Sequence, residues 1–250
     1  MANFSPGSDG TGIKSGGSSA DLSRDSGTSY SMNLVPGPSG PYQYLEFGVR
    51  NFTAVGFRAT YRAHMFFNLS GADAGTIESA TLKLYAGTAD SGGTLNNGHK
   101  FYVVGHDYGG SLNAAADDVN PTNNTAGDWT STSVPTYSSE ITVDGVSAND
   151  LISVTLNSTA ITEINNQLAS GNFDIGLSSH YDYKDDITLS PSVAAGSPVN
   201  GIYIRSQDYS DSNYRPVLEL NYAAPTTGPF KIQVGARVQV SSGKFKVGTI

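Results

Sequence analysis

Aromatic side chains with polar neighbours are the residues of this sequence best suited to binding chemistry. Tyrosine occurs 14 times against one tryptophan, and the segment HYDYKDD at 180–186 places Tyr181 and Tyr183 on the same side of a strand or loop. Such rings stack on a sugar or on a protein surface while neighbouring polar groups form hydrogen bonds. The candidate residues for binding a glycan or a partner are Trp129, Tyr181, Tyr183 and Tyr209. The alternative, in which the tyrosines only border a sandwich core, stays open.

Residues suited to catalysis are present but are not grouped along the chain. The sequence has no cysteine and no G-x-S-x-G pattern, so neither a thiol nucleophile nor a serine elbow is expected. The four histidines, at positions 64, 99, 106 and 180, show no i, i+4 zinc spacing. Asp117/Asp118 and Asp185/Asp186 are sequence neighbours in polar loops, where their side chains diverge instead of forming an acid–base pair. We therefore expect that the protein is not an enzyme.

No cofactor is expected, with one open alternative. Acid-rich loops hold calcium through oxygen ligands, and the segment DYSDSN at 208–213 is of this kind. It lacks the glycine and the terminal glutamate of the EF-hand loop. A structural calcium ion is the alternative that stays open, and the sequence identifies no metal ligands.

The charge balance restricts the classes of partner. The net charge is −8, so the field of the whole protein repels phosphate backbones and anionic lipids. No run of about 18 apolar residues is present, and the start MANFSPGSDGTG lacks the basic and apolar regions of a signal peptide. We expect neither nucleic acid nor a membrane as a partner.

The elements that would carry the candidate residues are mostly short strands. The apolar run Met65–Leu69, followed by alternation at Ala80, Leu82 and Leu84, predicts two strands joined by a polar loop, a pair that can seed a sheet. Further strands are expected at 42–49, 101–105, 141–143, 151–156, 173–177, 201–205 and 216–222.

One helix is expected, over Ser158–Ser170. Ser158 or Thr159 would cap its start, and Gly171 would end it. Many short strands with polar turns and a single short helix predict an all-β fold, an antiparallel jelly-roll β-sandwich.

The two ends of the chain differ from the domain between them. Residues 1–19, rich in Gly, Ser and Pro, are expected to form a flexible arm before the sandwich of residues 20–223. Residues 224–250 carry four basic residues and no acidic one, which leaves −12 on residues 1–223 (−8 minus +4). Alternation around Ser241–Gly243 predicts a hairpin, and because a lone hairpin is marginally stable it should dock on its own domain or on a partner. The residues expected to anchor it are Lys231, Arg237, Val238, Val240, Phe245 and Val247.

Four stretches in residues 20–223 carry a family resemblance. They are Ala20-Asp21, HMFFNLS followed by GTIESATLKLY, VTLNSTAITEINNQLASGNFDIGL, and IYIRSQDYSDSNYRPVLELNY. In this order they resemble the DNRLRE-type jelly-roll domains, which are related to carbohydrate-binding modules of bacterial and archaeal surface proteins. The resemblance implies a two-sheet jelly roll with a binding or structural role. The single tryptophan departs from relatives that carry several, and the terminal segments are not part of the family domain.

Two functions from different classes are expected from these features. The first is a non-enzymatic bacteriophage virion protein, a capsid decoration or a tail appendage, whose jelly roll projects while its terminal segments contact other virion proteins or copies of itself. The start at Met1 without a leader and the two terminal tails favour it. The alternative is a carbohydrate-binding or adhesion module, extracellular or at a cell surface, that recognises a polysaccharide.

Overall fold

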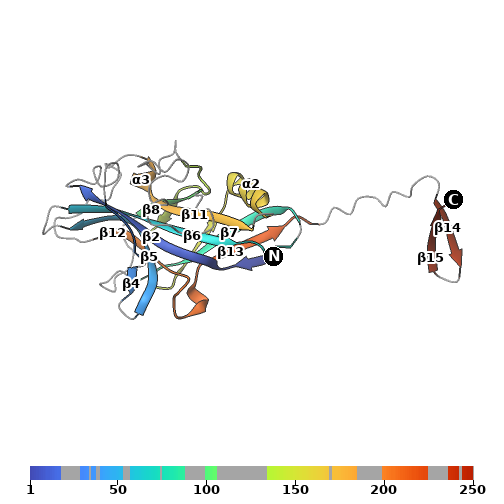
Figure 1. Cartoon of the computed structure of the whole chain (residues 1–250), viewed down its shortest axis with the longest axis horizontal. Coiled ribbons are helices and arrows are strands. Elements are labelled where there is room, and N and C mark those ends of the chain that lie inside the picture. The colour runs from blue at the N-terminus through green and yellow to red at the C-terminus, as the bar shows by residue number, and fades with distance from the viewer. Residues whose placement is uncertain are drawn as a thin grey trace.

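The structure is a computed structural model that describes most of the chain. The described residues are 1–17, 29–33, 35–37, 40–52, 57–73, 75–87, 99–105, 134–168, 171–184, 199–224, 236–241 and 244–249. In this part of the chain, antiparallel strands form two main sheets and a separate hairpin (Figure 1). The expected all-β, sandwich-like fold is confirmed. None of the described helices has the length and apolar character needed to cross a bilayer.

The smaller sheet shows how the sequence pattern builds two different faces. Its strands lie in the order β1 (Ala2–Phe4), β13 (Val217–Tyr222), β7 (Ile77–Tyr85) and β10 (Leu151–Thr155). One row across the sheet consists of Phe4, Leu218, Leu82 and Val154, and the next row of Asn3, Glu219, Thr81 and Thr155. Because successive strand residues point to opposite faces, the first row faces the core and the second faces outward.

Nine of the strands in the described residues form the larger sheet. Its main order is β12 (Val199–Arg205), β5 (Gly40–Phe52), β6 (Phe57–Asn68), β11 (Asn172–Ser179), β8 (His99–Gly105) and β9 (Ile141–Val143). Three further strands, β2 (Pro6–Gly17), β3 (Ser29–Asn33) and β4 (Val35–Gly37), pair alongside this path. β6 pairs with β2, β5 and β11, so it connects the parts of this sheet. The strands expected at 42–49, 101–105, 141–143, 151–156, 173–177, 201–205 and 216–222 are confirmed as β5, β8, β9, β10, β11, β12 and β13.

The hydrophobic core lies between the two sheets. Leu82, Leu84 and Leu218 enter it from the smaller sheet, while Met65 and Phe173 enter it from the larger one. Full burial of one such side chain contributes about 1.5–3 kcal/mol, so the alternating apolar positions of both sheets supply the main stabilising term.

The strands of the stretch 62–87 lie in different sheets. The sequence predicts that Met65–Leu69 and the alternating run that follows can seed one sheet, but β6 belongs to the larger sheet and β7 to the smaller. The polar loop between them therefore carries the chain across the edge of the sandwich. Alternation cannot distinguish the two arrangements, because apolar residues that face each other across a core show the same period as those on paired strands.

The flexible arm expected for residues 1–19 is wrong for residues 1–17, and residues 18 and 19 lie outside the described part of the chain. β1 pairs with β13 in the smaller sheet, and β2 pairs with β6 in the larger one, with Asp9 opposite Met65. The composition of this segment indicated too little apolar surface for order. A strand ladder, however, is held by main-chain hydrogen bonds, and Gly and Ser form these as well as apolar residues do.

The expected helix is confirmed as α2 (Ser158–Gln167), with a different cap. Asn157 is the N-cap residue, and its side chain accepts a hydrogen bond from the Ala160 N–H at 3.1 Å, so the caps expected at Ser158 or Thr159 are wrong. Gly171 follows the helix with a φ of 80°, a left-handed conformation that favours glycine. Two short helical segments that the sequence did not indicate are α3 (His180–Lys184) and the 3-10 turn η2 (Ser212–Tyr214).

The predicted C-terminal hairpin is confirmed as β14 (Ala236–Ser241) and β15 (Lys244–Thr249). Among the described strands these two pair only with each other, with Val238 opposite Val247 and Val240 opposite Phe245. Its docking stays a prediction.

Candidate functional site

Four tyrosines from three parts of the chain meet at one edge of the sandwich, and we call Tyr44, Tyr85, Tyr209 and Tyr214 the tyrosine surface. Tyr44 lies on β5, Tyr85 ends β7, and the other two lie on the loop between β12 and β13. The ring centroids are 6.4 Å apart for Tyr44 and Tyr209, 6.4 Å for Tyr209 and Tyr214, and 5.6 Å for Tyr214 and Tyr85. All four residues are half-buried, so the rings form a continuous and partly exposed aromatic series.

A buried arginine holds two of these rings. The guanidinium carbon of Arg205 lies 4.0 Å from the ring centroid of Tyr209 and 4.6 Å from that of Tyr44. Its Nε and Nη2 donate to Oδ1 of Asn149 at 2.9 Å and 2.7 Å. Arg205 is only 4% exposed, so these cation–π contacts are largely desolvated. Arg205 therefore positions the rings and joins them to the loop before β10.

The loop that carries Tyr209 and Tyr214 is held by its own hydrogen bonds. Arg215 Nε donates to the carbonyl oxygen of Tyr209 at 2.8 Å. The carboxylate of Asp211 caps η2 by accepting from the Asn213 N–H at 3.0 Å. A surface fixed in this way loses little conformational entropy when it binds, which favours affinity.

A buried carboxyl group on β2 also supports this loop. Asp9 Oδ2 accepts a hydrogen bond from the Gln207 N–H at 2.6 Å. Asp9 is 4% exposed, and burial raises the pKa of its carboxyl to about 7, with a further increase from the nearby charge of Asp208. The N-terminal segment thus contacts the candidate site directly, which no feature of the sequence indicated.

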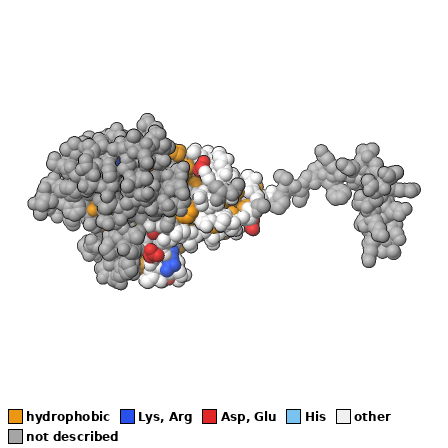
Figure 2. Space-filling view, viewed as in Figure 1, with side chains coloured by type: hydrophobic (Ala, Val, Ile, Leu, Met, Phe, Trp, Pro, Cys, Tyr) orange, Lys and Arg blue, Asp and Glu red, His pale blue; other side chains and the backbone are white. Residues whose placement is uncertain are grey.

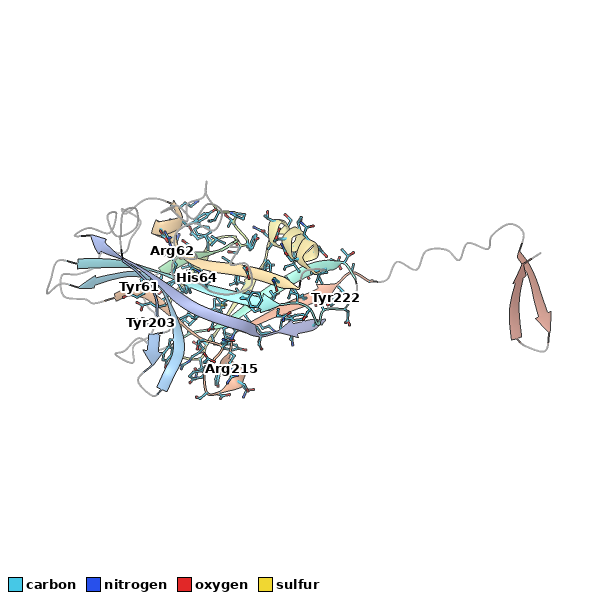
Figure 3. All side chains as sticks on the ribbon, in the orientation of Figure 1. Tyr61, Arg62, His64, Tyr203, Arg215 and Tyr222 are labelled. Atoms are coloured by element: carbon cyan, nitrogen blue, oxygen red, sulfur yellow. The ribbon has the colours of Figure 1, made fainter. Side chains whose placement is uncertain are left out.

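The rim of the tyrosine surface is polar and rich in acceptors. The exposed residues of the loop are Asp208, Ser210, Asp211, Ser212 and Asn213. Leu151, 51% exposed, lies opposite Tyr85 on β10 and adds an apolar contact point. Acidic and basic side chains lie next to each other at the lower end of the described surface in Figure 2, in the region where Figure 3 labels Arg215.

Tyr183 lies in a second aromatic cluster, away from solvent. It belongs to α3 rather than to the strand or loop expected for HYDYKDD, and it is 5% exposed. Its ring centroid lies 4.3 Å from that of Tyr102, and its hydroxyl forms a hydrogen bond with Oγ1 of Thr136. Tyr183 therefore packs inside the protein and offers no ring face to a glycan. Tyr181 lies in α3 as well.

The titratable groups next to Tyr102 are already paired with one another. The Tyr102 hydroxyl donates to Glu140 Oε2 at 2.9 Å, and Glu140 also contacts His180 Nδ1 and Lys100 Nζ, both at 2.6 Å. Burial and the bond to Glu140 raise the pKa of Tyr102, while the bond to Lys100 lowers that of Glu140. The tyrosine thus stays a neutral donor and the glutamate an anion. A tyrosine that acts as a general base must instead be deprotonated, and a glutamic acid that acts as a general acid must be protonated.

A buried ion pair joins α3 to β6. Arg62 Nε and Nη2 donate to the two carboxylate oxygens of Asp182 at 2.8 Å and 2.9 Å, and both side chains are fully buried. Ser178 Oγ donates to the same carboxylate at 3.3 Å. Arg62 and His64 lie on β6, well apart from the loop of Arg215 (Figure 3). This bidentate ion pair holds α3 on the outer face of the larger sheet.

The remaining candidate residues are only partly placed. Trp129, Lys231, His106 and the carboxylate pairs Asp117/Asp118 and Asp185/Asp186 lie outside the described residues. The residues expected to anchor the hairpin at positions 237, 238, 240, 245 and 247 lie in β14 and β15, and their role stays a prediction. Within the described part of the chain, no three His, Cys, Asp or Glu side chains come close enough to hold a metal ion.

Sequence reasoning found one of the four tyrosines of the surface. Tyr44, Tyr85, Tyr214 and the positioning residue Arg205 were missed. The one local signal was the segment YSDSNY, which places two tyrosines five residues apart at the ends of a polar turn.

No protein-family model matches the chain, and no curated protein matches it at a significant level.

Proposed function

We propose that this protein is a non-enzymatic structural component of a larger assembly, for which a virion is the best candidate. In this role, as a capsid decoration or a tail appendage, the sandwich projects and the C-terminal hairpin provides the attachment. The observation that carries the proposal is that β14 and β15 form a sheet of their own, while the other described strands pair within the sandwich. The N-terminal segment pairs within both sheets of the sandwich, so we do not propose it as an attachment element.

The hairpin has the properties of an attachment element. A two-stranded hairpin exposes main-chain donors and acceptors along both edges and is marginal when alone, so a partner sheet would complete it. Its register brings four apolar residues into two facing pairs, Val238 with Val247 and Val240 with Phe245. The charge of +4 on residues 224–250 favours an acidic partner, such as another virion protein or the acidic sandwich of a second copy.

Deletion of residues 226–250 tests the attachment. We expect a folded sandwich that no longer enters particles, because the strands of the core do not depend on β14 or β15. A matched variant, Val240→Lys with Phe245→Lys, keeps the length of the chain and places charge in one of the facing pairs. Particle incorporation of the deleted chain at the level of the full chain would refute the attachment role.

A second candidate function is carbohydrate binding or adhesion through the tyrosine surface. It is favoured by the partly exposed ring series and its acceptor-rich rim, because sugars stack their apolar faces on aromatic rings while their hydroxyls donate to carboxylates. This function is compatible with the first, since a projecting virion domain can adhere to a cell surface. The resemblance to DNRLRE-type jelly-roll domains supports a binding or structural role and stays part of the proposal.

Two alanine variants test this second function on a glycan array. Tyr209→Ala and Tyr214→Ala remove the two rings of the loop. The matched control is Tyr222→Ala, because Tyr222 is also half-buried and ends β13 far from Arg215 (Figure 3). We expect the first two variants to lose binding by about tenfold or more, since truncation of a tyrosine at the centre of a binding site costs about 2 kcal/mol or more. Equal binding by all three variants would contradict a role of the tyrosine surface.

The absence of catalysis is part of the same proposal. It is supported by the pairing of Tyr102 with Glu140, which leaves the phenol as a donor. Incubation of the purified chain with polysaccharides, followed by analysis of reducing ends and of unsaturated products, should show no turnover above background. Turnover that is lost in Tyr102→Phe would show that the paired cluster is an active site.

A further inference from the structure

We infer that two copies of this chain associate by pairing β10 with β10, so that their smaller sheets form one continuous sheet across a two-fold axis at Ser153. This association is independent of the proposed attachment through the hairpin, because it uses a different strand. The open edge of β10, its composition and its self-complementary register support it.

One side of β10 carries main-chain groups that have no partner among the described residues. On its other side β10 pairs with β7, where the Leu156 N–H donates to the carbonyl oxygen of Ala80 at 3.0 Å. Alternate residues of a strand direct their N–H and C=O groups to opposite sides, so those of Leu151, Ser153 and Thr155 point away from β7. The side chains of the same three residues are exposed. The outer edge of the smaller sheet is therefore open along β10.

β10 lacks the features that protect an edge strand from pairing with another chain. Its sequence, LISVT, contains no charged residue, proline or glycine, and its register with β7 has no bulge. The opposite edge strand of the same sheet, β1, is protected by its length of three residues. Apart from Met1, Leu151 is the one large apolar side chain among the described residues that is exposed, at 51%. An open edge of this composition is a template for a further strand.

A second copy of β10 fits this edge because the strand is complementary to itself. With Ser153 opposite Ser153 of the second copy, Leu151 lies opposite Thr155, and the three residue pairs each exchange two main-chain hydrogen bonds. The same contact covers the exposed side chain of Leu151. On the core face this register places Ile152 opposite Val154, so apolar side chains continue from one core to the other.

The charges beside β10 permit this pairing although the chain is acidic. Asp150 would lie opposite Leu156 of the second copy, and its carboxylate accepts a main-chain hydrogen bond within its own turn. Lys83, next to Ser153 on β7, is paired with Glu219 at 2.5 Å. No like charges of the described residues therefore face each other at the two-fold axis. The repulsion between two chains of charge −8 is largely screened at physiological salt.

The dimer would present two tyrosine surfaces on one face of the continuous sheet. Tyr85 lies opposite Leu151 and, like Lys83, belongs to the outer face of the smaller sheet. A strand spacing of about 4.8 Å and a rise of about 3.4 Å per residue place the two Tyr85 residues about 20 Å apart. Two sites on one face bind a polymeric ligand with avidity, from which the proposed carbohydrate binding would benefit.

Sedimentation equilibrium of the full chain tests the dimer. We expect a monomer–dimer equilibrium with a dissociation constant of about 10–100 μM, because a five-residue edge forms only a small interface. Ser153→Lys and Ser153→Glu each place like charges opposite each other at the two-fold axis and should weaken the dimer about fivefold or more. Ser153→Ala is the matched control and should keep the dimer, because the main-chain groups are unchanged.

An equimolar mixture of Ser153→Lys and Ser153→Glu tests the register. In a mixed dimer a lysine faces a glutamate, so we expect the mixture to dimerise at least as well as Ser153→Ala. Recovery in the mixture also shows that neither variant lost the dimer by unfolding.

Three results would overturn the inference. The first is a full chain that is monomeric at about 200 μM. The second is a dimer that Ser153→Lys leaves unchanged, which would place the association elsewhere, for example in the hairpin. The third is a mixture that stays monomeric, which would exclude pairing about Ser153. Particle incorporation tests the attachment role separately, so failure of the dimer and failure of the attachment are distinguishable.

Discussion

Replacement of Asp9 by asparagine is expected to change how the stability of the protein depends on pH. Asp9 is buried in β2, and its carboxyl contacts the loop of the tyrosine surface through the Gln207 N–H. Asparagine keeps an oxygen that can accept this hydrogen bond but has no charge to bury. The variant therefore separates the effect of ionisation from the effect of the contact.

The expected magnitude follows from the pKa of the carboxyl. Burial raises the pKa from an ordinary value of 3.8 to about 7, so between these values the folded chain holds a proton that the unfolded chain has lost. The stability from this group is therefore fully present below about pH 4 and is lost as the pH rises to about 7. A difference of about 3 units at 1.36 kcal/mol each gives a loss of about 4 kcal/mol in the wild-type chain, which Asp9→Asn should avoid.

Urea unfolding followed by circular dichroism at several pH values between 4 and 8 measures this effect. The wild-type chain and Asp9→Asn share all other titrating groups. The difference between their free energies of unfolding at each pH therefore reports the ionisation of Asp9. We expect the two free energies of unfolding to be similar at pH 4, and Asp9→Asn to be more stable by up to about 4 kcal/mol at pH 8. Asp9→Ala should also lack the loss of stability that the wild-type chain shows as the pH rises. It should be less stable than Asp9→Asn at every pH, because it also removes the acceptor for the Gln207 N–H.

Parallel pH profiles for the wild-type chain and Asp9→Asn would refute this reasoning, because a carboxyl buried as described must release its proton near neutral pH. A variant that is less stable than the wild type at pH 8 would refute it as well. Such a result would mean that the ionised carboxylate is stabilised in the fold.

Two further substitutions test the contacts that hold the larger sheet. Arg62→Met is expected to destabilise the protein by about 3–5 kcal/mol in urea unfolding, because it leaves the Asp182 carboxylate buried without its partner. Adding Asp182→Leu should recover much of that loss, and additive losses would contradict the pairing. Gly105→Ala is expected to cost about 1–3 kcal/mol, because a Cβ there would lie 2.6 Å from the buried ring of Tyr137 and 2.7 Å from Pro135. An unchanged melting temperature for Gly105→Ala would contradict this packing.

Much of the fold could be predicted from the sequence because alternation reports burial directly. Ala80, Leu82 and Leu84 are buried as their spacing predicts, and the helical spacing of Ile161 and Ile164 marks α2. The layering could not be predicted in the same way. Strands on opposite sides of a core carry the same pattern as neighbours in one sheet, so β6 and β7 could not be assigned to different sheets from period alone.

The candidate site was less predictable because it is assembled from distant parts of the chain. Tyr44 and Tyr85 join the loop of Tyr209 only through the pairing of β5 with β12 and of β7 with β13. The contact of Asp9 with Gln207 depends on a strand that pairs through its main chain, and its composition of Gly and Ser gave no sign of this. Tyr183 shows the converse, since its polar neighbours indicated a surface residue, whereas α3 turns it inward against Tyr102.

The division of the chain into a self-sufficient sandwich and a hairpin available to a partner is the basis of the proposed function. Thermal unfolding of the full chain and of residues 1–225, combined with the molar mass of each in solution, tests it most directly. We expect melting temperatures within about one degree of each other, because no described sandwich strand pairs with β14 or β15. A melting temperature several degrees lower for residues 1–225, with the same number of subunits in both proteins, would show that the hairpin packs on its own sandwich. That result would contradict the account.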